Sequence, residues 1–313
     1  MEINYLKREA LNTEKWNACV ESNLDTASVS GMSWYLDKSC DNWDAVIIDD
    51  YRSVIPFPCR KKWGIEYVYP PFFTSRTGVF GQNLAAKELD VILSLVSKKF
   101  KWIDTMLSPK TQINIDRYNH LKHRAFILDL QYSYTQLKKQ YHRNHTRNCR
   151  KAVENELKLI KNADIEAIIS LFIDNMAQNK QVKYTEKDYQ QLKELIVFLQ
   201  SKNAVEILGA SDKDGKLCAG IFFTHQDGKY NYLFSGRDKH NADNGSMFFI
   251  MDNFIALHAE NAHSLYINGS DNDLIARFYA GFGSQETYYY QLFFSHLNRL
   301  EREMLSLLRK IRK

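Results

Sequence analysis

Short apolar runs and periodic apolar positions in the first half of the chain predict three strands, a helix and a further strand. Residues 43–48, 54–59 and 65–73 form runs of strand length, separated by polar turn residues. Apolar residues recur every three or four positions over 84–96, which predicts an amphipathic helix. The apolar run over 102–107 predicts the last strand of the series.

The second half of the chain repeats this order. Runs over 204–210, 217–224 and 230–234 predict three strands, 246–259 predicts a helix and 265–267 predicts another strand. The first strands of the two series start 161 residues apart, the helices 162 apart and the last strands 163 apart. This nearly constant offset predicts an internal duplication of one α/β unit, and chance recurrence of a common element order is the alternative.

The second copy has additional elements at both ends. A strand over 157–161 and helices over 164–176 and 186–200 are predicted before it, and a helix over 271–282 and a strand over 287–294 after it. Three successive antiparallel strands followed by two crossovers predict a mixed sheet with helices on both faces. The expected fold class is therefore α/β.

The end of the last predicted core helix carries a recognisable motif. Phe278 to Gly283 read Phe-Tyr-Ala-Gly-Phe-Gly. Together with the element order, these residues resemble the GNAT superfamily of N-acyltransferases, in which this helix commonly ends in Phe/Tyr-Tyr-x-x-x-Gly. The tandem copies, a basic segment at the start of the second copy and Gly269-Ser270 at a strand end are similar to the Fem-like branch. Named members of that branch add amino acids to cell-wall precursors from aminoacyl-tRNA.

The resemblance covers nearly the whole chain and implies two tandem GNAT-like acyl-CoA N-acyltransferase domains in a protein of bacterial type. Residues 1–130 are expected to form a degenerate domain, and residues 131–295 the candidate catalytic domain. Apolar positions at helical spacing and a basic end predict an amphipathic helix over 296–313. This helix is expected to lie on the body of the protein or to join a homodimer, and a membrane surface is the alternative.

Two departures from the family pattern bear on catalysis. Fem-like sequences often read approximately Asp-Phe-Glu-Gly-Ser at the strand end, whereas this chain reads Tyr266-Ile267-Asn268-Gly269-Ser270. The usual GNAT phosphate loop, Arg/Gln-x-x-Gly-x-Gly/Ala, is also missing. Asn268 stays a candidate substrate-binding residue, and the two losses favour a third hypothesis of a non-catalytic binding protein on a decayed transferase scaffold.

Acyl transfer to an amine needs a held donor, a deprotonated amine, a stabilised oxyanion and a proton for the leaving group. Tyr279 is the candidate proton donor, because its place in the helix-end motif matches that of a general-acid tyrosine in many GNAT enzymes. The alternative is that Tyr279 only contributes to an apolar helix face with Leu274, Ile275 and Phe282. The sequence does not single out a general base.

The loop before the 246–259 helix is the candidate donor-binding segment. A helix N-terminus offers free N–H groups to a phosphate, and basic side chains add charge-assisted bonds. The residues assigned to acyl-CoA binding are Arg237, Lys239, His240, Gly245 and Ser246. A solvated loop at an ordinary helix start is the alternative interpretation.

Residues 138–151 contain six Lys or Arg side chains and no acidic residue. On a helix, Arg143, Arg147 and Arg150 fall at i, i+4 and i+7 and form a one-sided cationic stripe. This stripe suits a phosphate-rich donor such as tRNA or an anionic substrate, and the alternative is a solvated linker helix. Histidine pairs at i, i+3 lack a nearby carboxylate or cysteine in a metal-site pattern, so no metal is expected.

Composition narrows the class of protein. The 313 residues are long enough for two domains, and 44% hydrophobic and 25% charged residues are typical of a globular chain. Five scattered cysteines predict neither a disulfide framework nor a zinc site and favour a reducing compartment. Neither a signal peptide nor an apolar run of membrane-spanning length is evident, so a cytoplasmic location is expected.

The sequence thus predicts an N-acyltransferase in which an amine acceptor attacks the acyl group of acyl-CoA directly. The alternative is a Fem-like transferase that takes an amino acid from aminoacyl-tRNA, although a net charge of +5 is small for a tRNA-binding protein.

Overall fold

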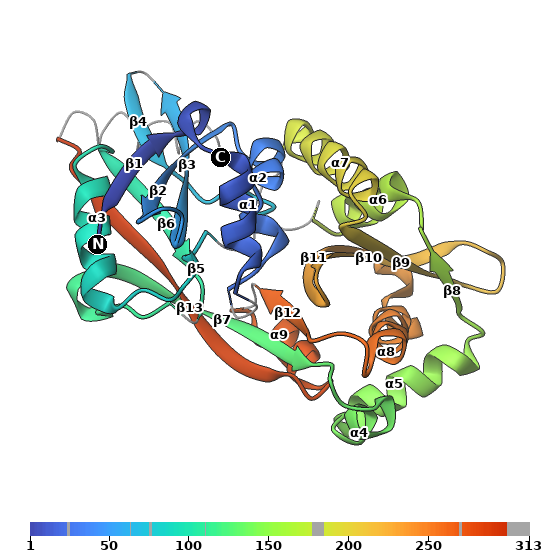
Figure 1. Cartoon of the computed structure of the whole chain (residues 1–313). Coiled ribbons are helices and arrows are strands. Elements are labelled where there is room, and N and C mark those ends of the chain that lie inside the picture. Colours follow the sequence, from blue (N-terminus) through green and yellow to red (C-terminus); the bar gives the residue numbers. More distant parts are fainter. Residues whose placement is uncertain are drawn as a thin grey trace. The chain divides into compact units, whose positions relative to one another are not determined.

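The computed structural model describes residues 1–23, 26–62, 64–74, 77–109, 111–176, 185–268 and 271–298 (Figure 1). The chain forms two compact units. Unit 1 contains Met1–His123 and the chain from Tyr289 onward, and unit 2 contains Arg124–Tyr288. No helix in the described part of the chain is long and apolar enough to cross a membrane.

Unit 1 is built on a mixed sheet in the order β1-β2-β3-β4-β6-β13, in which only β4 and β6 pair in parallel. Its strands are β1 (Ile3–Lys7), β2 (Asn42–Ile48), β3 (Ser53–Lys62), β4 (Ile65–Val68), β5 (Phe80–Gly81, paired with β3), β6 (Trp102–Leu107) and β13 (Gln285–Ser295). Its helices are α1 (Thr13–Glu21), α2 (Ser33–Ser39) and α3 (Ala86–Ser97), with 3-10 turns η1 (Arg8–Ala10), η2 (Val29–Gly31) and η3 (Ile115–Arg117).

The predicted stripe on the first-half helix is confirmed. Leu89, Ile92, Leu93 and Val96 of α3 are buried in the core of unit 1. Hydrophobic burial of these side chains orients the helix on the sheet.

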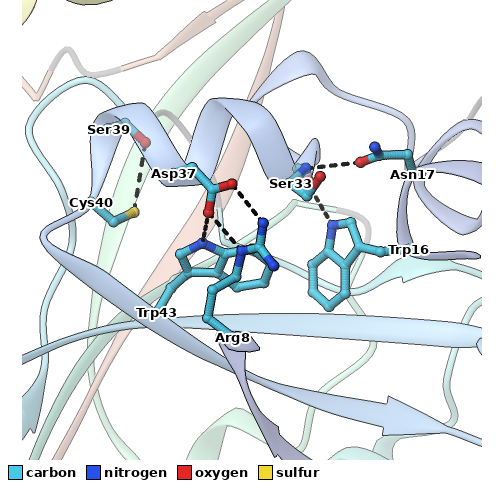
Figure 2. A network of polar contacts seen from close by, with 9 residues as sticks. Arg8, Trp16, Asn17, Ser33, Asp37, Ser39, Cys40 and Trp43 are labelled. Atoms are coloured by element: carbon cyan, nitrogen blue, oxygen red, sulfur yellow. Dashed lines mark hydrogen bonds and ion pairs between the residues drawn. The ribbon is translucent and has the colours of Figure 1, made fainter. Parts of the chain in front are cut away.

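A polar network attaches α1 and α2 to β2 (Figure 2). Asp37 of α2 accepts two hydrogen bonds from Arg8 at 2.7 Å and one from Trp43 Nε1 at 2.9 Å. The indole of Trp16 in α1 donates to the carbonyl of Gly31 at 2.8 Å. Burial alone would raise the pKa of Asp37, but the hydrogen bonds from Arg8 and Trp43 outweigh it and lower that pKa, so this carboxylate stays ionised.

Unit 2 has the strand order β7-β12-β11-β10-β9-β8, and only β11 and β12 pair in parallel. Its strands are β7 (Asn119–Asp129), β8 (Lys158–Lys161), β9 (Val205–Ser211), β10 (Leu217–Gln226), β11 (Lys229–Arg237) and β12 (Ser264–Asn268). Its helices are α4 (Tyr134–Lys139), α5 (Arg143–Glu154), α6 (Ile165–Met176), α7 (Glu186–Ser201), α8 (Ser246–His258) and α9 (Asp273–Ala280), with the 3-10 turn η4 (Lys239–Asn244).

Helices cover both faces of the unit 2 sheet, as expected. Neighbouring residues of a strand point to opposite faces. Phe222 stacks on Phe234, which contacts Phe172 of α6, whereas Phe223 stacks on Phe254 of α8 at 4.0 Å between ring centroids. The α/β fold class is confirmed.

The predicted duplication is visible in the strand pairing of both units. β2, β3 and β4 form an antiparallel series, α3 follows, and β6 returns parallel to β4. In unit 2, β9, β10 and β11 form the same series, α8 follows, and β12 returns parallel to β11.

Two strands pair outside the domains that divisions at residues 130 and 295 would give them. β7 follows the elements of unit 1, but its residues 125–129 pair with β12 of unit 2. β13 follows α9 of unit 2, but its residues 290–295 pair with β6 of unit 1. The two compact units therefore differ from a serial division at residues 130 and 295. The helix expected over 296–313 falls, from residue 299 onward, outside the described residues.

Candidate active site

The parallel pair β11 and β12 ends before β11 does. Lys229–Tyr232 pair with Ser264–Ile267, while β11 continues to Arg237. Among the described residues, 233–237 have no strand partner on their β12 side; we call this segment the open edge of β11. Strand residues without a neighbouring strand present backbone N–H and C=O groups that a ligand can bond.

A bulge shapes the start of the open edge. The register between β10 and β11 shifts at Phe222/Phe223, so that Phe222 faces Phe234 and Phe223 faces Tyr232. In a regular strand, residues three apart point to opposite faces, but one extra residue places them on the same face. The bulge at Leu233 therefore lets Ser235 share a face with Tyr232.

Three hydroxyls form a chain at this position. Tyr232 interacts with both Ser235 on the open edge and Tyr279 of α9, and we call these three side chains the hydroxyl chain. The rings of Tyr232 and Tyr279 meet edge to face at 5.5 Å between centroids. The hydroxyl chain Ser235–Tyr232–Tyr279 thus connects the buried helix-end tyrosine to the open edge.

Both phenols are buried and protonated at neutral pH. Burial raises the pKa of Tyr279 to about 12, and it raises the pKa of Tyr232 well above its usual value. A protonated phenol in this place can give a proton to a developing anion.

The apolar face expected for α9 is only partly buried. Ala276, Tyr279 and the following Phe282 belong to the core of unit 2. Leu274 and Ile275, expected in the same core face, are 73% and 44% exposed, so that part of the prediction was wrong. They lie in the first turn, whereas the later residues of the helix are the ones that pack into the core.

Asn268 ends β12, where it pairs in register with Ala125 of β7 and directly follows the last residue paired with β11. The structure thus places Asn268 and Tyr232 at the same end of the β11–β12 pair. Sequence reasoning missed Ser235. The aromatic run in the third strand of the second copy pointed to Tyr232 as a possible lining of an acceptor site, but not to its contact with Tyr279.

The loop expected to bind the donor separates into a buried part and a surface part. Gly245 has a φ of +87°, and a Cβ added there would lie 2.6 Å from the carbonyl oxygen of Asn148 in α5. The Ser246 N–H donates to the side chain of Asn244 at 2.9 Å, and Ser246 is buried. Asn244 therefore takes one N–H at the N-terminus of α8, and α5 lies against this end of the helix.

Arg237, Lys239 and His240 of the same loop are exposed. Lys239 and His240 line a hollow of about 650 Å³ together with the end of α5 and the turn between β9 and β10. Its walls carry both signs of charge, with Lys151 and Lys213 near Glu154 and Asp212. The mixture gives this hollow no strong preference for an anion.

The three arginines of the predicted cationic stripe lie on one exposed face of α5. Arg143, Arg147 and Arg150 line a hollow of about 660 Å³ with Asn144 and Thr146. Arg150 has Glu154 at 3.4 Å, whereas Arg143 and Arg147 have no carboxylate partner among the described residues. Guanidinium groups are the side chains that pair best with phosphate oxygens.

Comparison with known proteins supports the fold. No protein-family model matches the chain, and no curated protein sequence matches it. Among solved structures, the chain is similar to FemX, with a TM-score of 0.66, 11% identity and coverage of 93% of this chain and 97% of FemX.

Two further structures show the same architecture. A tandem GNAT protein from the clavulanic acid biosynthesis pathway matches with a TM-score of 0.55, 10% identity and coverage of 93% and 98% of the two chains. L-PGS from Bacillus licheniformis matches with a TM-score of 0.52, 10% identity and coverage of 90% and 96%. The chain therefore has a tandem GNAT-like fold with Fem-like structural relatives.

Proposed function

We propose that the chain is an N-acyltransferase whose unit 2 transfers an acyl group to an amine at the open edge of β11. The observation that carries this proposal is the hydroxyl chain Ser235–Tyr232–Tyr279, in which the ring of Tyr232, beside the open edge, meets the ring of the helix-end tyrosine edge to face at 5.5 Å between centroids. The GNAT-like fold supports it.

The reaction follows from these groups. The acyl carbonyl lies at the open edge, where a backbone N–H stabilises the oxyanion formed when the amine attacks. The new C–N bond forms, the bond between the acyl carbon and the leaving oxygen or sulfur breaks, and Tyr279 supplies the proton that the leaving atom takes up. The attacking amine releases its proton to water, and Tyr279 takes a proton back from water before the next turnover.

The acidity of Tyr279 favours an oxygen leaving group. With a pKa of about 12, Tyr279 is a much weaker acid than a thiol with its pKa of about 8.5, so it protonates a thiolate only uphill. An alkoxide of a ribose is a far stronger base and gains from such a donor. An aminoacyl ester of tRNA supplies this leaving group.

The arrangement of α5 favours the same donor. Its arginine hollow offers guanidinium groups to a phosphate backbone. At the same time, α5 covers the N-terminus of α8, where the diphosphate of acyl-CoA was expected. We therefore propose an aminoacyl-tRNA as donor and, following the Fem-like resemblance, a cell-wall precursor amine as acceptor.

Acyl-CoA is the second candidate donor. The similarity to the tandem GNAT protein, which was solved without AcCoA, favours this donor. Thermal shift separates the two: CoA or acetyl-CoA at millimolar concentration should raise the melting temperature only if it binds the folded chain.

The test of the proposal is amine-dependent deacylation of aminoacyl-tRNA. Labelled aminoacyl-tRNA is incubated with the protein and a lysine-containing peptide, and loss of acid-precipitable label is measured. Tyr279→Phe should lower kcat by about 10²- to 10⁴-fold, and the exposed Tyr132→Phe should match the wild type. Transfer by Tyr279→Phe at the wild-type rate would refute the assignment, and binding without turnover by the wild type would favour the non-catalytic alternative.

A further inference from the structure

The C-terminal end of α9 meets the N-terminal end of α5. The last carbonyls of a helix lack partners within the helix and need others. His145 Nε2 lies 2.8 Å from the carbonyl oxygen of Phe278, and the backbone N–H of His142 donates to the carbonyl of Gly281 at 2.9 Å. Because a carbonyl only accepts, Nε2 carries the proton. We call these four residues the α5–α9 junction.

His145 is held tightly at this junction. Its side chain is 3% exposed, and a Cβ added at Gly281 would lie 1.9 Å from its ring, so the imidazole fits only above a glycine. The rings of Phe248 and Phe282 enclose it at 5.0 and 4.6 Å between centroids. One ring orientation is therefore imposed.

A histidine is an unfavourable choice for this place. Its Nδ1 atom is buried and has no hydrogen-bond partner in the described part of the chain, which costs stability that an apolar side chain of similar size would not. What the histidine adds is the donor to Phe278, one residue before Tyr279. The junction also sets the positive end of the α5 dipole against the negative end of α9.

We propose that His145 is a positioning residue for the acyl-transfer reaction, because it caps the last turn of α9 and thereby fixes Tyr279 against Tyr232. This inference rests on the proposed function, in which Tyr279 gives the proton. The opposite face of α5 carries the arginine hollow. One helix thus sets both the place of the donor phosphates and the place of the proton donor.

The test compares two substitutions at His145. In His145→Leu the donor to Phe278 is removed, and kcat should fall by roughly ten- to a hundredfold while the KM for aminoacyl-tRNA stays the same. In His145→Gln an amide N–H can still reach the carbonyl, so most of kcat should return. His225→Leu, at a half-buried histidine of β10, is the matched control and should keep the wild-type kcat.

Hydrogen exchange measures positioning without activity. The amides of Gly281, Phe282 and Gly283 bond to the carbonyls of α9, and they should exchange about tenfold faster in His145→Leu but not in His225→Leu. Faster exchange over the whole of unit 2 would instead show a general loss of stability and would overturn the proposal.

Unchanged kcat in His145→Leu, or an equal loss in His145→Gln, also overturns it. If the leucine variant does not fold, His145→Asn replaces it, since asparagine is too short to reach Phe278. If the proposed function is wrong, Tyr279→Phe will have the same kcat as the wild type. The hydrogen-exchange result then still decides whether His145 holds the end of α9 in place.

Discussion

At the scale of single residues, buried polar side chains determine how the stability of unit 2 depends on pH. Two histidines of unit 2, His145 and His225, have a pKa lowered from 6.5 chiefly by burial. Below pH 6.5 the unfolded chain therefore binds more protons than the folded chain. The free energy of unfolding consequently falls as the pH falls toward the pKa values of the folded state.

This sign predicts that stability falls as the pH drops below about 6.5, before the carboxylates with lowered pKa, such as Asp37 and Asp238, become protonated. Thermal melts in steps of pH should show it. His145→Gln should flatten part of the slope, and His145→Gln with His225→Gln should flatten most of it. A slope that is unchanged in the double variant contradicts the assignment.

Gly281 is the residue on which the α5–α9 junction depends. Gly281→Ala would place a methyl group within the ring of His145, whose neighbours leave it nowhere to move. We expect a loss of about 1–3 kcal/mol in the free energy of unfolding, measured by urea denaturation. Gly215→Ala is the control, because nothing lies within 4 Å of its added Cβ, although its φ of +85° gives it backbone strain alone.

At the scale of elements, the periodicity of the sequence predicted which face of a helix is buried or exposed better than it predicted which other element that helix contacts. The stripe of α3 and the helical register of Arg143, Arg147 and Arg150 follow from spacing along the sequence, and both are confirmed. His145 meets Phe278, and Gly245 meets Asn148, although the members of the two pairs lie 133 and 97 positions apart in the sequence. No local pattern carries such pairings, so the sequence did not reveal that α5 covers the start of α8.

The exposed face of α5 gives the prediction that belongs to this scale. Replacement of Arg143, Arg147 and Arg150 by Gln should weaken tRNA binding and reduce the slope of log K against log salt by about 0.7–0.9 for each phosphate that the variant no longer neutralises. Binding is measured by filter retention at several salt concentrations. Lys187→Gln, on α7, should leave both affinity and slope unchanged, and an equal salt slope in the triple variant would exclude the arginine hollow as the tRNA site.

At the scale of the whole molecule, the duplicated plan was readable from the sequence but the exchange of strands was not. Residues 287–294 form an aromatic-rich run that fits a strand in either unit, because strand propensity does not specify which strand lies beside it. In the structure, β13 pairs with a strand of unit 1 and β7 pairs with a strand of unit 2. Each strand should therefore stabilise the core of the unit with which it pairs, and this can be measured.

Leu292 of β13 and Leu128 of β7 test this exchange as a reciprocal pair. Leu292 is fully buried in the core of unit 1, and Leu128 is 1% exposed in the core of unit 2. Each change to Ala should cost about 2–5 kcal/mol through reduced burial and a residual cavity.

Hydrogen exchange should rise in α3 and β6 for Leu292→Ala, and in α8 and β12 for Leu128→Ala. The opposite distribution would mean that each strand belongs to the copy beside it in the sequence. Because unit 2 holds the hydroxyl chain, only Leu128→Ala should also shift the protection of α9, which makes Leu292→Ala the control for effects on the active site.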